Sequence, residues 1–175
     1  VRPLPQPLVD KVRTGVTLNS FHQAVAELLA NALDASAQSI VIKFSAGALT
    51  FTVEDDGHGI HGEDLDVLGS RYSTSKMRSM ADLQIGLRTL GFRGEAISSV
   101  CESSAEVSIT TRARGCFETL TKSVRGGGKE ALVGPSASQL THSGTIITVK
   151  RFLFNQPVRQ RQLAAQHEDV EANTV

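Results

Sequence analysis

We expect the rest of the chain to pack around one segment, Ala24-Val25-Ala26-Glu27-Leu28-Leu29-Ala30-Asn31-Ala32-Leu33-Asp34-Ala35. Its apolar residues recur with the spacing of a helix that buries one face in a core. They are Val25, Leu28, Leu29, Ala32 and Leu33. Glu27, Asn31 and Asp34 share a second stripe, because steps of about 100° per residue bring them to one side of the helix. A solvated polar face is the simpler interpretation of this stripe, and the lining of a cavity is the alternative.

The composition predicts a single domain. The chain has 175 residues, of which 40% are hydrophobic, and the missing initial methionine suggests a partial chain. Its 18 basic and 18 acidic residues cancel, so any contact with nucleic acid must be local. The longest apolar runs are too short to span a membrane, and residues 1–5 do not resemble a signal peptide. Cys101 and Cys116 fit neither a zinc site nor a disulfide framework, so we expect two free thiols.

Periodicity predicts helices before and between antiparallel strands. Alternating apolar residues indicate strands at about 39–44, 49–53, 105–112, 116–123, 129–133 and 144–151. Helices are expected at about 19–35, 63–68 and 95–100, the first with Asn19 or Ser20 as its N-cap. The stretch between the second and third helices is polar and lacks periodicity, as long functional loops do. The pattern is typical of an α+β sandwich.

Two alternatives for the glycine-rich turn after the second strand fail on physical grounds. Gly57-x-Gly59-x-x-Gly62 has the spacing of a dinucleotide-binding loop, but Asp55 and Asp56 directly before it would repel a pyrophosphate. His58 and His61 with the acidic residues after them could suggest a metal cluster. Their spacing fits no common metal site, so we interpret them as exposed loop histidines.

A nucleotide site accounts for these residues better. Glycines beside Asp55 bring the backbone close to a flat ligand, and the carboxylate can accept from an exocyclic amine, which adenine has and guanine lacks at that position. The exposed backbone donors of Gly91-Phe92-Arg93-Gly94, at the start of a helix, suit a phosphate. Asn31 offers an oxygen ligand for Mg²⁺. Glu27, one turn earlier, is placed to accept a proton from an attacking water.

The chain resembles the GHKL ATPases through motifs that occur in the family's order. These are Glu27-x-x-x-Asn31-x-x-Asp34-Ala35, Asp55-x-Gly57-x-Gly59, Thr74-Ser75-Lys76, Gly91-Phe92-Arg93-Gly94-Glu95-Ala96 and Gly144-Thr145. The form Gly-Phe-Arg-Gly-Glu-Ala is that of MutL homologues. Residues 69–76, with Arg71-Tyr72, and residues 11–15 are most similar to the third eukaryotic MutL homologue.

This resemblance implies a Bergerat-type ATP-binding sandwich, a mostly antiparallel sheet with helices on one face. It implies Glu27 as general base, Asn31 as Mg²⁺ ligand, Asp55 and Thr145 beside adenine, and residues 69–95 as an ATP lid. Within the lid it implies residues near the phosphates: Thr74, Ser75, Lys76, Gly91, Phe92, Arg93, Gly94 and Glu95. The family's second lobe and C-terminal region do not occur in this sequence.

The implied function is a slow, Mg²⁺-dependent ATPase that switches the conformation of a mismatch-repair and meiotic-recombination complex in the nucleus. The implied partners are the first MutL homologue, as a heterodimer, and mismatch-recognition proteins of the MutS type. Two alternatives remain: a GHKL-type kinase, which would not use Glu27, and a nucleotide- or partner-binding module without significant turnover. DNA contact through Arg151, Arg159 and Arg161 is an alternative to a solvated face there.

Overall fold

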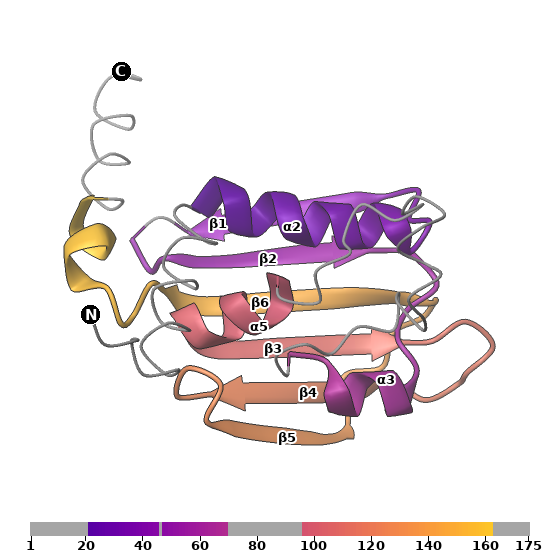
Figure 1. Ribbon diagram of the computed structural model, residues 1–175. Helices are drawn as coiled ribbons and strands as arrows, with labels where there is room; N and C mark the ends of the chain where they lie inside the picture. Colours follow the sequence, from indigo (N-terminus) through magenta and orange to yellow (C-terminus); the bar gives the residue numbers. More distant parts are fainter. Residues whose placement is uncertain (1–20, 46, 70–95, 163–175) are drawn as a thin grey trace, which may run out of the picture.

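The computed structural model describes residues 21–45, 47–69 and 96–162. Six strands form one antiparallel sheet with the order β1-β2-β6-β3-β4-β5. Three helices, α2, α3 and α5, lie in front of this sheet in Figure 1. The α+β class and the antiparallel sheet expected from the sequence are confirmed.

The elements fall close to the predicted ranges. The strands are β1 Ile40–Ser45, β2 Thr50–Asp55, β3 Ser104–Arg112, β4 Leu120–Arg125, β5 Glu130–Pro135 and β6 Gly144–Phe152. The labelled helices are α2 Phe21–Asp34, α3 Gly62–Val67 and α5 Ala96–Ser103, and residues 157–162 are also helical. The expected N-cap residues Asn19 and Ser20 lie outside the described residues. No described helix is long and apolar enough to cross a membrane.

The predicted start of the fourth strand, at residue 116, is wrong. Arg112 donates from Nε to the carbonyl oxygen of Cys116, 2.9 Å away, and the Cys116 amide donates to the Ala113 carbonyl at 3.0 Å. These bonds fold the segment into a turn, so β4 begins only at Leu120. Cys101 and Cys116 are both free thiols, as expected.

The C-terminal end of α2 has a defined cap. Ser36 adopts a left-handed backbone conformation with φ of 61°. Its amide donates to the Leu33 carbonyl at 2.9 Å, and the Ala37 amide donates to the Ala32 carbonyl at 3.1 Å. This pair of bonds is a Schellman motif, in which the left-handed residue reverses the chain and satisfies the last carbonyls of the helix. The chain therefore turns directly from α2 into β1.

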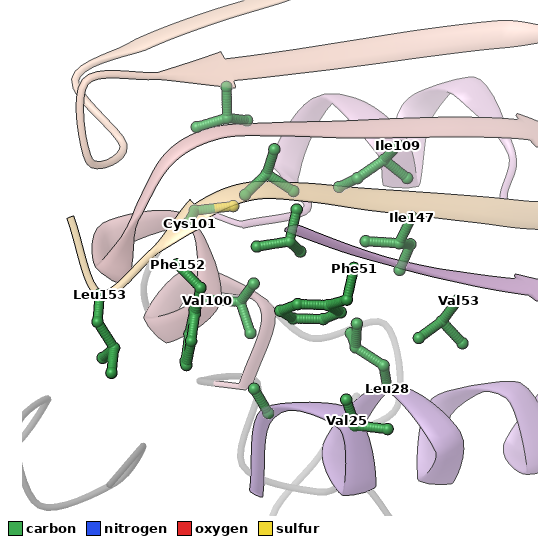
Figure 2. Close-up of a cluster of buried hydrophobic side chains, with 14 of the residues drawn as sticks. Val25, Leu28, Phe51, Val53, Val100, Cys101, Ile109, Ile147, Phe152 and Leu153 are labelled. Carbon is green, nitrogen blue, oxygen red and sulfur yellow. The ribbon is translucent and has the colours of Figure 1, made fainter. Parts of the chain in front are cut away.

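One face of the sheet carries the core (Figure 2). Phe51 lies between the sheet and the helices in Figure 2 and packs edge-to-face on Phe152 with ring centroids 5.7 Å apart, and Val107, Ile109 and Val149 are fully buried. Burial of each such side chain stabilises the fold by about 1.5 to 3 kcal/mol. The alternate residues face away and are mostly polar, as in the Thr110–Thr121 hydroxyl pair at 2.9 Å. The helices α2, α3 and α5 thus all pack on the same face of the sheet.

The apolar stripe of α2 is narrower than predicted. Ala24, Val25, Leu28 and Ala32 are buried, but Leu33 is 54% exposed, so its assignment to the core face is wrong. A residue eight positions along has rotated past the buried sector, because 3.6 residues make one turn. The polar stripe of Glu27, Asn31 and Asp34 is half-buried rather than fully solvated. Its side chains thus lie at the boundary between the core and the surface.

Candidate active site

Polar residues from three neighbouring strands meet at one end of the sheet, on the right in Figure 1. Asp55 ends β2, and its register partner on β6 is Thr145. Thr145 is in turn the register partner of Thr111 near the end of β3. Side chains of register partners lie on the same face of a sheet. Asp55, Thr145 and Thr111 therefore form one row on the face that the helices cover.

The Asp55 carboxylate is held in place by the backbone. Its Oδ1 accepts a hydrogen bond from the Gly57 amide at 2.9 Å. Burial raises the pKa of this carboxyl above its usual value, and the backbone N–H groups of Gly57 and Thr145 oppose the shift. Desolvation disfavours the charged form, whereas donors to the carboxylate favour it. The arrangement is a partly desolvated acceptor with a fixed orientation.

The glycines of the loop after β2 are required by the protein's own packing. A Cβ atom on Gly57 would lie 2.8 Å from the Cβ of Ala35, and one on Gly59 would lie 2.1 Å from the Arg112 carbonyl oxygen. Gly59 also has a φ of 71°, which favours glycine. The sequence interpretation gave these glycines a role towards a ligand. The structure adds a close approach of backbone to backbone.

This loop is joined to the end of α2. The His58 amide donates to the Ala35 carbonyl at 3.0 Å. Because Asn31 and Asp34 lie in the last turns of α2, the bond brings the helix end with the polar stripe to the Asp55 loop. The first two sequence motifs, far apart in the chain, thus meet in the fold.

Thr111 joins the loop to the two strands, and the sequence analysis missed it. Its hydroxyl accepts from the Ile60 amide at 2.9 Å, donates to the Gly144 carbonyl at 3.0 Å and lies 3.2 Å from the Thr145 hydroxyl. Thr111 is 1% exposed. The available signal was its place in the alternation of β3, two residues beyond the buried Ile109. That alternation predicts an inward side chain, although it does not predict the bonds.

Lys122 is a second residue that sequence reasoning missed. It lies on β4, is 3% exposed, and donates from Nζ to the carbonyl oxygens of Leu65 at 3.0 Å and Asp66 at 2.7 Å. Burial lowers the pKa of this ammonium group, and the charge of Asp66 opposes the shift. Lys122 therefore binds the last turn of α3.

Several expected site residues lie outside the described part of the chain. They are Thr74, Ser75, Lys76, Gly91, Phe92, Arg93, Gly94 and Glu95. The same holds for the expected lid apart from Gly69, which follows α3.

The described residues test the metal alternative at His58 and His61. His58 Nδ1 lies 2.7 Å from the carbonyl oxygen of Gly59, and both histidines are exposed. Within ranges 21–45, 47–69 and 96–162 no group of three or more His, Cys, Asp or Glu side chains could hold a metal. Asn31 is half-buried on α2 and offers an amide oxygen one turn from Glu27. Mg²⁺ takes few protein oxygens and completes its shell with phosphates and water, so the Asn31 amide oxygen fits the ion.

The sequence of this chain is similar to those of known proteins. Residues 19–143 match the family described as histidine kinase-, DNA gyrase B- and HSP90-like ATPase. The chain is 31% identical over 170 residues to the DNA mismatch repair protein MLH3 of Arabidopsis thaliana, covering 97% of this chain and 14% of that protein. It is 33% identical over 168 residues to the DNA mismatch repair protein MutL of Streptococcus pneumoniae serotype 19F, covering 95% of this chain and 25% of that protein.

Two solved structures are similar to this fold. The crystal structure of the N-terminal domain of a DNA repair protein has a TM-score of 0.67 and 26% identity, and covers 90% of this chain and 43% of that chain. The Aquifex aeolicus MutL ATPase domain complexed with ADP has a TM-score of 0.57 and covers 85% of this chain and 53% of that chain. At 21% identity the second likeness shows the fold alone.

Proposed function

Because this chain belongs to the family of histidine kinase-, DNA gyrase B- and HSP90-like ATPases, we propose that it binds ATP with Mg²⁺ at the Asp55 end of the sheet and hydrolyses it slowly. The observation that carries the proposal is the row of Asp55, Thr145 and Thr111 beside the end of α2. In this row Asp55 supplies a fixed acceptor for a nucleotide base, and the nearby Asn31 supplies an amide oxygen suited to a metal.

Each described residue has a distinct role in this proposal. Asp55 accepts a hydrogen bond from the adenine amine, and Thr145 lies beside the same base. The amide oxygen of Asn31 binds Mg²⁺, which neutralises charge on the phosphates. Glu27 takes the proton from the attacking water. The Gly57 bond to Asp55 supports the first role, since it orients a carboxylate that has further lone pairs with which to accept from the base.

The family also contains kinases, and hydrolysis is favoured here by Glu27. A carboxylate on the same stripe as Asn31 suits the activation of water, whereas phosphate transfer to a histidine does not need it. A module that binds nucleotide without turnover would keep Asp55 and Asn31 and make no use of Glu27. Turnover measured against bound nucleotide distinguishes these two functions.

The biological role we propose is that of a conformational switch in DNA mismatch repair and meiotic recombination, in the nucleus. It is supported by the names of the relatives, of which this chain spans 14% and 25%. In a longer protein this lobe, with residues 69–95 as its lid, would precede a second lobe and a C-terminal region. The proposed partners are the first MutL homologue, in a heterodimer, and mismatch-recognition proteins of the MutS type.

We also propose a local contact with DNA at a groove whose lining is rich in basic side chains. It is lined by the basic side chains of Arg125, Lys150 and Arg151 and by the carboxylate of Glu106. Glu106 pairs with Lys150 at 3.3 Å and with Arg125 at 3.9 Å, which leaves an excess of positive charge. Replacing Lys150 and Arg151 with Ala should weaken binding to duplex DNA and reduce its salt dependence, since each phosphate contact releases counterions. Lys43→Ala, on β1, is the control, and equal binding by both variants would exclude the groove.

The experiment that tests the nucleotide site is a calorimetric titration of ATP with and without Mg²⁺. A hydrogen bond to a charged group contributes about 1.5 to 3 kcal/mol, so Asp55→Ala should weaken ATP binding by about tenfold or more. Glu130→Ala removes an exposed carboxylate from β5 and should leave binding unchanged. Absence of ATP binding by the unmodified chain, or equal affinity for ATP and GTP, would contradict the adenine assignment.

A further inference from the structure

We infer that Thr111 determines purine specificity by fixing the direction in which the Thr145 hydroxyl can hydrogen-bond. The inference rests on the proposed nucleotide site, since it concerns the base that Asp55 and Thr145 would contact. The observation behind it is the set of three partners that surround the Thr111 hydroxyl oxygen.

The bonding capacity of a hydroxyl assigns the proton in each of these contacts. A hydroxyl has one hydrogen to donate and two lone pairs that accept. The Ile60 amide can only donate, so it occupies one lone pair of Thr111 at 2.9 Å. The Gly144 carbonyl can only accept, so it takes the single Thr111 hydrogen at 3.0 Å. One lone pair of Thr111 is left.

The remaining contact, 3.2 Å from the Thr145 hydroxyl, must therefore use the hydrogen of Thr145. Thr111 and Thr145 are 1% and 5% exposed, so water cannot easily replace either partner. A buried hydroxyl whose hydrogen is already donated presents only lone pairs to anything else that it meets. Thr145 is thus an acceptor towards the site.

Asp55 lies beside Thr145 in the same row and, when ionised, is also an acceptor. Together the two residues require hydrogen-bond donors from the ligand or from a water molecule bound to it. The amine on carbon six of adenine supplies them. The carbonyl on carbon six of hypoxanthine or guanine presents lone pairs instead, and a site with unpaired buried acceptors rejects it.

Thr111→Val removes the acceptor for the Thr145 hydrogen while keeping the side-chain shape. The Thr145 hydroxyl then becomes free to donate to a carbonyl on carbon six. We expect the ratio of the Kd for inosine triphosphate to the Kd for ATP to fall by about tenfold, the value of one well-formed hydrogen bond. Thr111→Ser keeps the hydroxyl and should keep the ratio of the unmodified chain.

The control is Thr110→Val on the same strand. Thr110 points to the opposite face and pairs with Thr121 at 2.9 Å. Thr110→Val therefore removes one threonine hydroxyl pair and leaves the row of Asp55, Thr145 and Thr111 unchanged. Folding of every variant is checked by circular dichroism, and each ratio is measured by calorimetry on the same preparation. The control ratio should equal that of the unmodified chain.

Thr145→Val gives a second, independent answer, because it leaves Thr111 with Ile60 and Gly144 as partners. If Thr145 is an acceptor, its removal favours inosine triphosphate over ATP. If Thr145 donates to the base, its removal disfavours inosine triphosphate. A ratio that is unchanged in Thr111→Val, or that rises in Thr145→Val, would overturn the inference while ATP binding itself persists. Failure of the unmodified chain to bind either nucleotide would instead remove the proposed function and the inference with it.

Discussion

The carboxylates of Asp55 and Asp56 are adjacent in the chain, yet their pKa values are displaced in opposite directions. Burial raises the pKa of Asp55. Hydrogen bonds from the backbone amides of Ser39 and Gln38 lower the pKa of Asp56, whose Oδ1 accepts both at 2.9 Å and 2.7 Å. Asp55 is the last residue of β2 and Asp56 is the first residue after it, and the two carboxylates diverge, one to the site and the other to the loop that follows α2.

Replacement of these two residues should change acid stability in opposite ways. A lowered folded-state pKa gives stability above the ordinary value of 3.8 that is lost as the pH falls below it, so Asp56→Asn should destabilise the protein at pH 7, and the difference should shrink as the pH falls towards 3. For Asp55 the raised pKa gives stability below 3.8 that is lost as the pH rises, so Asp55→Asn should not destabilise at pH 7. Urea denaturation between pH 7 and pH 3 measures both effects. A constant difference between Asp56→Asn and the unmodified chain across this range would contradict the assignment.

Gly59 should tolerate no side chain. Gly59→Ala places a Cβ atom 2.1 Å from the Arg112 carbonyl oxygen at a φ of 71°, so the loop must move. Strain of this kind costs roughly 1 to 3 kcal/mol in addition to the clash, and the free energy of unfolding should fall by more than about 2 kcal/mol. Gly134→Ala is the matched control, since a Cβ there meets nothing within 4 Å. Equal stability of the two variants would show that the loop has more freedom than its contacts indicate.

The sequence predicted the elements better than the bonds between them. Alternation located β2, β3 and β6 within one or two residues, because each buries every second side chain against the helices. It also located β1 at Ile40–Ser45, but it did not predict the burial of this strand, because five of its six residues are exposed although Ile42 and Phe44 alternate. That strand forms an edge of the sheet, and periodicity carries no information about neighbours.

Residues whose role depends on distant partners escaped prediction. Thr111 and Lys122 belong to strands that were predicted in whole or in part, but the first binds the loop after β2 and the second binds α3. A buried lysine inside a strand runs against the rule that lysine is almost never fully buried unless it is paired. Only the fold supplies its carbonyl partners. Local pattern thus indicates which way a side chain points, and tertiary contacts decide what it does.

Lys122 gives a stability prediction with a clear control. Lys122→Met keeps the length of the side chain but removes the donor to the carbonyl oxygens of Leu65 and Asp66. Loss of hydrogen bonds from a charged donor outweighs the relief of burying that charge, and the free energy of unfolding should fall by roughly 2 kcal/mol in urea denaturation. Lys129→Met, in the exposed turn before β5, should change it by less than about 0.5 kcal/mol. A Lys122→Met protein as stable as the control would mean that α3 does not depend on this lysine.

Replacing Glu27 should impair hydrolysis and replacing Asn31 should impair binding, although both residues lie on the half-buried stripe of α2. Glu27→Ala removes the proposed proton acceptor and leaves the proposed metal ligand, so ATP should still bind while single-turnover hydrolysis falls by about 10²-fold or more. Asn31→Ala removes the oxygen proposed for Mg²⁺, so the Mg²⁺-dependent part of binding itself should weaken. Equilibrium binding is measured with and without Mg²⁺, and hydrolysis is measured in a longer protein that contains the second lobe. Glu130→Ala, which removes a carboxylate from β5, should match the unmodified protein in both measurements.

Hydrolysis by Glu27→Ala at the unmodified rate would show that another group activates the water. Such a result would favour a nucleotide-binding switch in which α2 holds the metal and contributes no base.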